Sequence, residues 1–308
     1  MVRYDRRTAD RGAKYVEDRR GSGGRRRVGG GGGKAVGGIG GLILLIIAAI
    51  FGIPALGGGD GLGIDATSGL DAGAVDTGDI EVVDPDADTK LFMQFLMVDI
   101  QDTWAEYFDS AGITYQETTL VVFDGSVSSG CGRATAAVGP FYCPAPNDQK
   151  VYVDFAFYDD LSRRFGAPGD FAQAYVIAHE VGHHIQSITG ISDAVRSAQA
   201  QDPGNKNAYS VRQELQADCL AGVWAFSASQ RLTEETGRPI IERGDIEEGL
   251  AAAAAVGDDR IQAQAGMSID PHTWTHGSSA QRVTWFKEGY DNGDPELCDP
   301  FERDVNNP

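Results

Sequence analysis

The pattern of apolar and polar positions predicts a mainly helical fold over the C-terminal two thirds of the chain. Apolar residues recur every three or four positions over 171–188 and 208–230, which is the period of an amphipathic helix. Two short runs rich in β-branched and aromatic residues, 118–123 and 151–155, are typical of strands. We therefore predict an α+β fold in which several helices pack on a small sheet. The other predicted helices span 91–104, 157–165, 243–256, 258–265 and 278–290.

The pattern is different before residue 90. Residues 35–56 form an uncharged, largely apolar run that is long enough for one helix across a bilayer. The flanking segments are rich in glycine, the first one basic and the second one acidic. We predict a disordered tail over 1–34, a single transmembrane helix over 35–56, a flexible acidic linker over 57–89 and a folded domain over 90–308. Two alternatives are a cleaved signal peptide and a short edge strand at 80–83.

The charge distribution supports this division. The net charge of −19 combines an excess of basic residues in 1–34 with a strongly acidic remainder. Positive charge before an apolar span favours a cytoplasmic N-terminus, so we predict a single-pass protein of the cell membrane with its domain outside the cytoplasm. The basic tail would lie against anionic lipid head groups. A domain this acidic is a poor nucleic-acid binder, because phosphate attracts basic groups.

Four cysteines fit an oxidising location. Cys131 and Cys143 bracket a glycine-rich loop and are suitable disulfide partners, and Cys219 and Cys298 would form the second bridge. The alternative is that Cys219 is a free buried thiol. A role for Cys219 as a metal ligand is disfavoured, since no second cysteine has ligand spacing with it.

The most informative motif is His179-Glu180-Val181-Gly182-His183 within the predicted helix 171–188. Two histidines four positions apart lie on one helix face and can reach a single metal ion. The intervening Glu180 can reach a metal-bound water without ligating the metal. The alternative is a helix whose histidines are satisfied by neighbouring carboxylates.

A third ligand is expected from the helix over 208–230. Glu214 and Asp218 are four positions apart, so both carboxylates project from one side and repel each other unless a cation lies nearby. Zinc bound by Glu214, with Asp218 accepting the outer N–H of a ligand histidine, would remove this repulsion. The alternative is a solvated acidic face.

These motifs identify a resemblance. HEVGHH at 179–184 and ELQADCLAGVWA at 214–225 resemble the bacterial neutral zinc metallopeptidase family, which belongs to the zincins. The resemblance covers roughly residues 90–300 and implies a zincin-like metallopeptidase domain with one Zn²⁺ per chain. It implies zinc ligands His179, His183 and Glu214, with Glu180 as catalytic base. Further matching stretches are 141–144, 150–154, 256–262, 275–277 and 281–286.

The resulting hypothesis is a membrane-anchored zinc peptidase that hydrolyses a peptide or protein substrate. Glu180 would take the proton of the zinc-activated water and pass it to the leaving amine. His276 is the first candidate for stabilising the transition state, followed by Tyr209 and Arg212. His184 lies about 100° around the helix from His183 and is expected to pack or hydrogen-bond. Two alternatives are a non-catalytic, zinc-stabilised surface binding module and a zinc amidase acting on cell-wall peptide.

Overall fold

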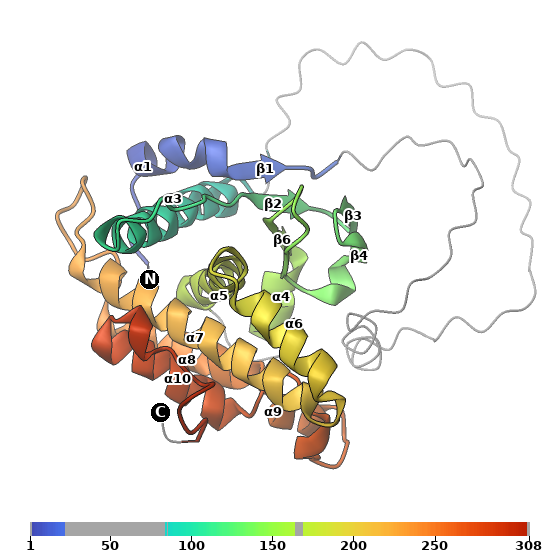
Figure 1. Cartoon of the computed structure of the whole chain (residues 1–308). Helices are drawn as coiled ribbons and strands as arrows, with labels where there is room; N and C mark the ends of the chain where they lie inside the picture. The colour runs from blue at the N-terminus through green and yellow to red at the C-terminus, as the bar shows by residue number, and fades with distance from the viewer. Residues whose placement is uncertain (1, 22–83, 85, 164–168, 307–308) are drawn as a thin grey trace, which may run out of the picture.

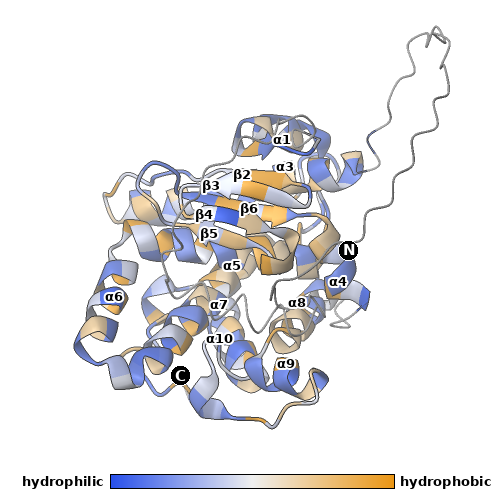
Figure 2. Ribbon diagram, turned by 90° about the vertical axis from the view of Figure 1, so that its right-hand side faces the viewer, coloured by the Kyte–Doolittle hydropathy of each residue, from blue (hydrophilic) through white to orange (hydrophobic). Residues whose placement is uncertain are grey.

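The main sheet contains four strands in the order β1, β2, β6, β5, of which Figure 1 labels the first three and Figure 2 labels β5. The computed structural model describes residues 2–21, 84, 86–163 and 169–306. β1, β2 and β6 are parallel, and β5 pairs antiparallel with β6 at one edge. The strands span Val16–Asp18 (β1), Leu120–Phe123 (β2), Phe141–Cys143 (β5) and Lys150–Asp154 (β6).

Both faces of this sheet are covered. Successive side chains of a strand point to opposite faces, so Leu120 and Val122 join the large core beneath the helices. Val121 and Phe123 point the other way and pack under the hairpin of β3 (Ser126–Ser129) and β4 (Gly132–Thr135). Hydrophobic residues accordingly concentrate in β2 and β6, as Figure 2 shows.

The helix α5 (Asp170–Ile188) lies at the centre of the molecule, and 14 of its 19 residues are buried. It packs against the sheet on one side and against neighbouring helices on the others (Figure 1). The motif histidines are therefore held by an element that is surrounded by protein. The other α-helices of the described residues are α1 (Arg6–Arg11), α3 (Ala87–Ser110), α4 (Ala156–Arg163), α6 (Ile191–Gln201), α7 (Lys206–Gln230), α8 (Arg243–Ala255), α9 (Asp258–Gln264) and α10 (Ser279–Asn292).

The mainly helical α+β prediction is confirmed. Each predicted helix is present with small shifts at its ends, and α3 is longer than the predicted 91–104. Both predicted strands are present as β2 and β6. The sequence analysis missed the helix α6. It also missed the strands β1, β3, β4 and β5, which are only three or four residues long.

The prediction of a disordered tail is wrong for residues 2–21. They form α1, a 3₁₀ turn over Gly12–Tyr15 and β1, which pairs with β2. Gly12 lies so close to α3 that an added Cβ would clash with the carbonyl oxygen of Gln94. Arg20 then forms ion pairs with Asp84 and Asp86, whose carboxylates lie 2.6 and 2.9 Å away. Basic residues that suggested a solvated tail are thus bound to acidic partners.

The single-pass arrangement must be corrected. Among the helices of the described ranges, none is long and apolar enough to cross a bilayer. The predicted transmembrane helix at 35–56, most of the linker at 57–89 and the alternative strand at 80–83 lie outside the described residues. One membrane crossing between residues 21 and 84 would separate β1 from β2, yet the two strands are hydrogen-bonded neighbours. A cytoplasmic tail joined through one transmembrane helix to an external domain is therefore wrong.

Candidate metal centre

The two motif histidines lie on α5 where it packs closely against α7. Gly182 permits this approach, because an added Cβ would lie only 3.0 Å from the carbonyl oxygen of Ala217 and 3.1 Å from its Cα. A larger side chain at position 182 would push the helices apart. The glycine therefore sets the distance across which His179 and His183 reach Glu214 on α7.

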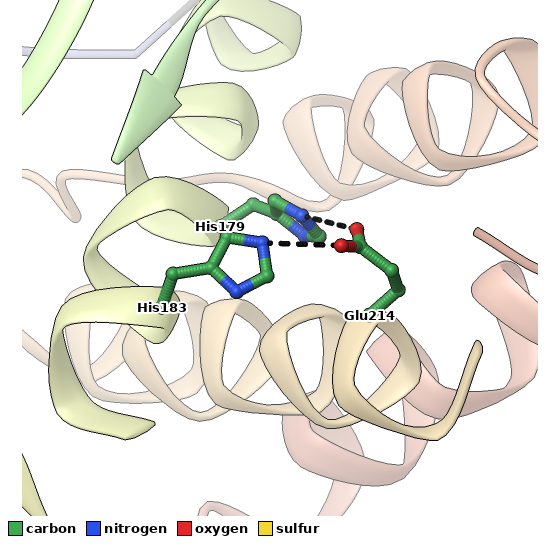
Figure 3. A group of neighbouring side chains, drawn as sticks. All are labelled: His179, His183 and Glu214. Carbon is green, nitrogen blue, oxygen red and sulfur yellow. Dashed lines mark hydrogen bonds and ion pairs between the residues drawn. The ribbon is translucent and has the colours of Figure 1, made fainter. Parts of the chain in front are cut away.

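Three donor atoms meet between the two helices (Figure 3). The Nε2 atom of His179 lies 3.2 Å from one carboxylate oxygen of Glu214, and the Nε2 atom of His183 lies 3.5 Å from the other. One ligand atom from each residue lies within 4.8 Å of the others. Donor atoms about 2.0–2.2 Å from a tetrahedral zinc lie roughly 3.3–3.5 Å apart. The three residues fit a zinc site with two nitrogen ligands and one oxygen ligand.

The outer nitrogen of each histidine is already engaged. The Nδ1 atom of His179 lies 2.8 Å from the carboxylate of Asp218, and that of His183 lies 2.9 Å from the amide oxygen of Gln186. Partners at Nδ1 fix the ring orientation and leave Nε2 for a metal. Both histidines are thus oriented for binding through Nε2.

Electrostatic coupling in this group is strong. Burial lowers the pKa of His179, but the carboxylates of Asp218 and Glu214 outweigh it and raise that pKa to about 9. Burial raises the pKa of Glu214, yet His183 and His179 hold it well below its ordinary value. Without metal, the cluster therefore favours a charged carboxylate beside protonated imidazole, and a cation would replace those protons.

Glu180 lies in the same buried region without a fixed partner. Its side chain receives no hydrogen bond or ion pair from any residue that the structure describes, although its charge raises the pKa of His183. It follows His179 directly on α5. The Glu180 carboxylate therefore makes no contact that holds the three donor residues together.

His276 is held beside this cluster by a carboxylate of its own. Asp258, at the start of α9, accepts backbone N–H bonds from Thr275, His276 and Gly277 and lies 3.2 Å from the Nδ1 atom of His276. Burial lowers the pKa of His276, but Asp258 and the charge of Glu214 outweigh it and raise that pKa. The loop thus holds His276 within electrostatic range of the candidate ligand Glu214.

Three other residues named by the sequence analysis have contacts away from the donor set. His184 is buried against Tyr142 and the carbonyl oxygen of Gln116, and burial lowers its pKa. The hydroxyl of Tyr209 lies 3.5 Å from Asp202, and the Arg212 guanidinium lies 3.5 Å from the carbonyl oxygen of Ala208. These contacts favour His276 over Tyr209 and Arg212.

Both predicted disulfides are present, so Cys219 is not a free thiol. Cys131–Cys143 ties the β3–β4 hairpin to β5, and Cys219–Cys298 ties the C-terminal segment to α7. The described residues contain no free cysteine. Cys219 follows Asp218 directly on α7, so the second disulfide joins the C-terminal segment to the helix that carries Glu214.

Sequence reasoning missed three residues around the histidines. Gln186 is three positions after His183 and Tyr175 is four positions before His179, which places each on the same face of α5 as its histidine. That spacing could have found them. Arg282 on α10 contacts Asp218 from a distant part of the sequence, and no local signal points to it.

A second group of acidic side chains is a weaker metal candidate. Asp170, Asp245 and Glu248 bring three carboxylates together but contribute no histidine. Burial raises the pKa of Asp170 and of Glu248, which favours their neutral forms. The mixed nitrogen and oxygen donors on α5 and α7 match zinc better.

Comparison with known proteins gives one consistent family. The family described as "Putative neutral zinc metallopeptidase" matches residues 5–301, which includes the N-terminal segment that forms α1 and β1. The chain is 43% identical over 293 residues to "Uncharacterized protein YpfJ" of Escherichia coli strain K12, covering 94% of this chain and 96% of that protein. It is 48% identical over 191 residues to "Uncharacterized protein Rv2575" of Mycobacterium tuberculosis strain H37Rv, covering 61% of this chain and 63% of that protein. No solved structure matches the chain. Because the family match spans nearly the whole sequence, the chain belongs to this neutral zinc metallopeptidase family.

Proposed function

We propose that this protein is a zinc-dependent peptidase, in which His179, His183 and Glu214 hold zinc and Glu180 is the general base. The observation that carries this proposal is that three donor residues meet within 4.8 Å, while the carboxylate of Glu180 lies within electrostatic range of His183 and has no hydrogen-bond donor among the described residues. Zinc, when bound, supplies a Lewis acid that activates water and polarises a carbonyl group. Peptide bonds in peptides or proteins are the substrate class.

Glu180 carries out the proton transfers. As water attacks the peptide carbonyl, the carboxylate accepts a proton from that water. The resulting carboxylic acid then donates the proton to the leaving amine, which restores the carboxylate. A freely available carboxylate suits this exchange, since a fixed ion-pair partner would hold its negative charge in place.

His276 stabilises the developing negative charge on the carbonyl oxygen. Its Nδ1 atom faces Asp258, and its Nε2 atom makes no hydrogen bond to any described residue. A pre-positioned N–H donor at a developing oxyanion contributes strongly to catalysis. Asp258 keeps the imidazole oriented and, together with Glu214, favours its protonated form.

The competing class is a protein in which zinc only stabilises the fold. A structural zinc site has all four positions filled by protein ligands, whereas a catalytic site keeps one position open. The donor set here has three residues. The carboxylate of Glu180 makes no contact that holds this donor set together, so a purely structural zinc site would not need it.

The variant Glu180→Gln tests this proposal. We expect it to fold and to bind zinc as wild type does while cleavage of a peptide library falls at least a hundredfold, since general-base catalysis contributes about 10²–10⁴. Glu248→Gln on α8 is the matched control and should cleave normally, because it removes a half-buried glutamate outside the donor set. Wild-type cleavage by Glu180→Gln, or a purified protein without zinc affinity, would contradict the proposal. Cleavage of cell-wall fragments but not of peptides would support the amidase instead.

We also propose that the folded domain works in an oxidising compartment outside the cytoplasm. All four cysteines form disulfides, which are rare in reducing compartments. Residues 2–21 share that compartment, because β1 pairs with β2. Four reactive thiols in protein isolated without reductant would contradict this location.

A further inference from the structure

Arg282 is a buried side chain outside the donor set that makes several hydrogen bonds. It lies in the first turn of α10, and only 4% of its side chain is exposed. Its Nε and Nη2 atoms donate to the two carboxylate oxygens of Asp218 at 2.8 and 2.9 Å. Nη2 also donates to the Tyr175 hydroxyl at 3.1 Å and lies 3.3 Å from the Nδ1 atom of His179. Nη1 donates to the carbonyl oxygen of Val256 at 3.3 Å. One guanidinium therefore joins α10 to α5, α7 and the end of α8.

The position of the Asp218 carboxylate depends on these contacts. A guanidinium fork that binds both oxygens fixes the carboxylate plane, whereas a single donor would leave it free to rotate. The oxygen Oδ1 also accepts a hydrogen bond from the Tyr175 hydroxyl and faces the Nδ1 atom of His179 at 2.8 Å. Asp218 has no exposed surface, so no solvent molecule replaces a lost donor without rearrangement.

Close packing of two helices keeps Arg282 in place. An added Cβ at Gly289 of α10 would lie 1.9 Å from the carbonyl oxygen of Cys219, and one at Gly222 of α7 would lie 2.1 Å from the carbonyl oxygen of Phe286. The backbones of α7 and α10 are therefore in contact directly beside Asp218. This contact leaves little freedom in the distance between the guanidinium and the carboxylate.

We propose that Arg282 is a positioning residue for the metal centre, which acts on the ligand His179 through Asp218. The guanidinium fixes the carboxylate, the carboxylate fixes the imidazole through Nδ1, and Nε2 then points at the donor set. This inference rests on the proposed zinc site and extends it to a residue on a third helix. Partners of this kind typically change metal affinity by 10–100-fold when they are removed.

A second arginine provides a matched control. Arg231, just after α7, lies 2.8 Å from Asp99, whose side chain is 6% exposed and also accepts a hydrogen bond from Trp224. This pair also joins an arginine to a buried carboxylate, although Arg231 is 28% exposed and binds one carboxylate oxygen, and it contacts none of the candidate ligands. Removing Arg231 therefore measures how much the loss of such an ion pair lowers stability when the metal centre is left intact.

The test compares Arg282→Met, Arg282→Lys and Arg231→Met in the full-length protein. The readouts are the zinc dissociation constant from chelator competition, the visible spectrum of the Co²⁺-loaded protein and the melting temperature of the metal-free protein. We expect Arg282→Met to weaken zinc binding 10–100-fold and to shift the Co²⁺ bands, with Arg282→Lys in between. Arg231→Met should lower the melting temperature but keep the zinc constant within about twofold and leave the spectrum unchanged.

A double variant shows whether the effect passes through Asp218. In the Asp218→Asn background, Arg282→Met should cause a much smaller loss of zinc affinity than in wild type, since only the weaker direct contact of Nη2 with His179 remains. Additive losses would overturn the proposal, and so would wild-type affinity and spectrum in Arg282→Met. If Arg282→Met does not fold, Arg282→Lys decides by the same two readouts. A wild-type protein that binds neither Zn²⁺ nor Co²⁺ overturns the proposed function as well, whereas wild-type behaviour of the Arg282 variants overturns this inference alone.

Discussion

The surroundings of His179 and His183 differ although both residues are candidate ligands of one metal. Behind His179 lies a charged group, in which Asp218 is bound by Arg282 and Tyr175. Behind His183 lies a neutral chain of amides: Gln186 donates to Gln216, which donates to the carbonyl oxygen of Cys298. His179 on α5 is thus oriented by an ion pair between α7 and α10. His183 is oriented by amides that end at a disulfide.

The difference indicates that the partners of His179 and those of His183 have different roles at the metal centre. A carboxylate at Nδ1 makes the imidazole a stronger electron donor, whereas an amide only orients it. The charged side should therefore set the affinity for zinc, and the neutral side should mainly set geometry. Because the groups behind His179 are charged, their contribution to stability should depend on pH. Removing one of them should also lower stability strongly, because a buried charge that loses its partner is destabilising.

The largest expected effect comes from Asp218→Asn. The substitution leaves Arg282 buried without its counter-charge, so we expect a loss of about 3–5 kcal/mol in the free energy of unfolding. Zinc affinity should fall 10–100-fold, because His179 loses its charged partner. Chemical denaturation and chelator competition measure the two losses. Asp99→Asn is the control that should lose stability without losing zinc affinity, and unchanged zinc affinity in Asp218→Asn would remove the distinction between the two histidines.

The next effect is a pH dependence of the metal-free protein. The pKa of His179 is raised to about 9, so the stability that its protonated form contributes is fully present below about pH 6.5 and is lost as the pH rises through 9. We expect a decrease of up to about 3 kcal/mol over this range. Denaturation curves in the presence of a chelator at several pH values measure it. Zinc-saturated protein should lack this decrease, and a metal-free protein with flat stability from pH 6.5 to 9 would refute the charged coupling.

The smallest effect is expected on the neutral side. Gln186→Met keeps the volume of the side chain but removes the amide contacts to His183, Gln213 and Gln216. We expect a loss of about 2–3 kcal/mol in stability, as each of the three neutral hydrogen bonds contributes about 1 kcal/mol. Zinc affinity should fall less than tenfold. If competition with a chelator shows a loss as large as that of Asp218→Asn, the charge of the partner is not what separates the two sides.

The sequence contained the local part of the site but not the part that depends on the fold. His179, Glu180 and His183 lie within five residues of one helix, and Glu214 and Asp218 lie one turn apart on another, so helical spacing alone grouped them. Arg282 is 64 positions after Asp218, and its approach depends on contact between α7 and α10 at Gly222 and Gly289. Periodicity in one segment carries no information about such a contact.

The same limit explains the wrong prediction at the N-terminus. Composition marked residues 1–34 as a basic, disordered tail, because each arginine was counted as a solvated charge. In the structure Arg20 binds Asp18, Asp84 and Asp86. β1 is only three residues long and finds its partner β2 more than 100 positions later. A short strand that is stabilised by a distant partner has no signature of its own.

The pairing of β1 with β2 also bears on how the protein can be handled in the laboratory. All four residues of β2 are buried, and its outer hydrogen-bonding edge is occupied by β1. A recombinant fragment that starts at residue 84 would turn β2 into an open, hydrophobic edge, which is a template for pairing with other chains. Residues 2–21 therefore cover this edge and prevent β2 from pairing with other chains. An expression boundary drawn from composition alone would remove them.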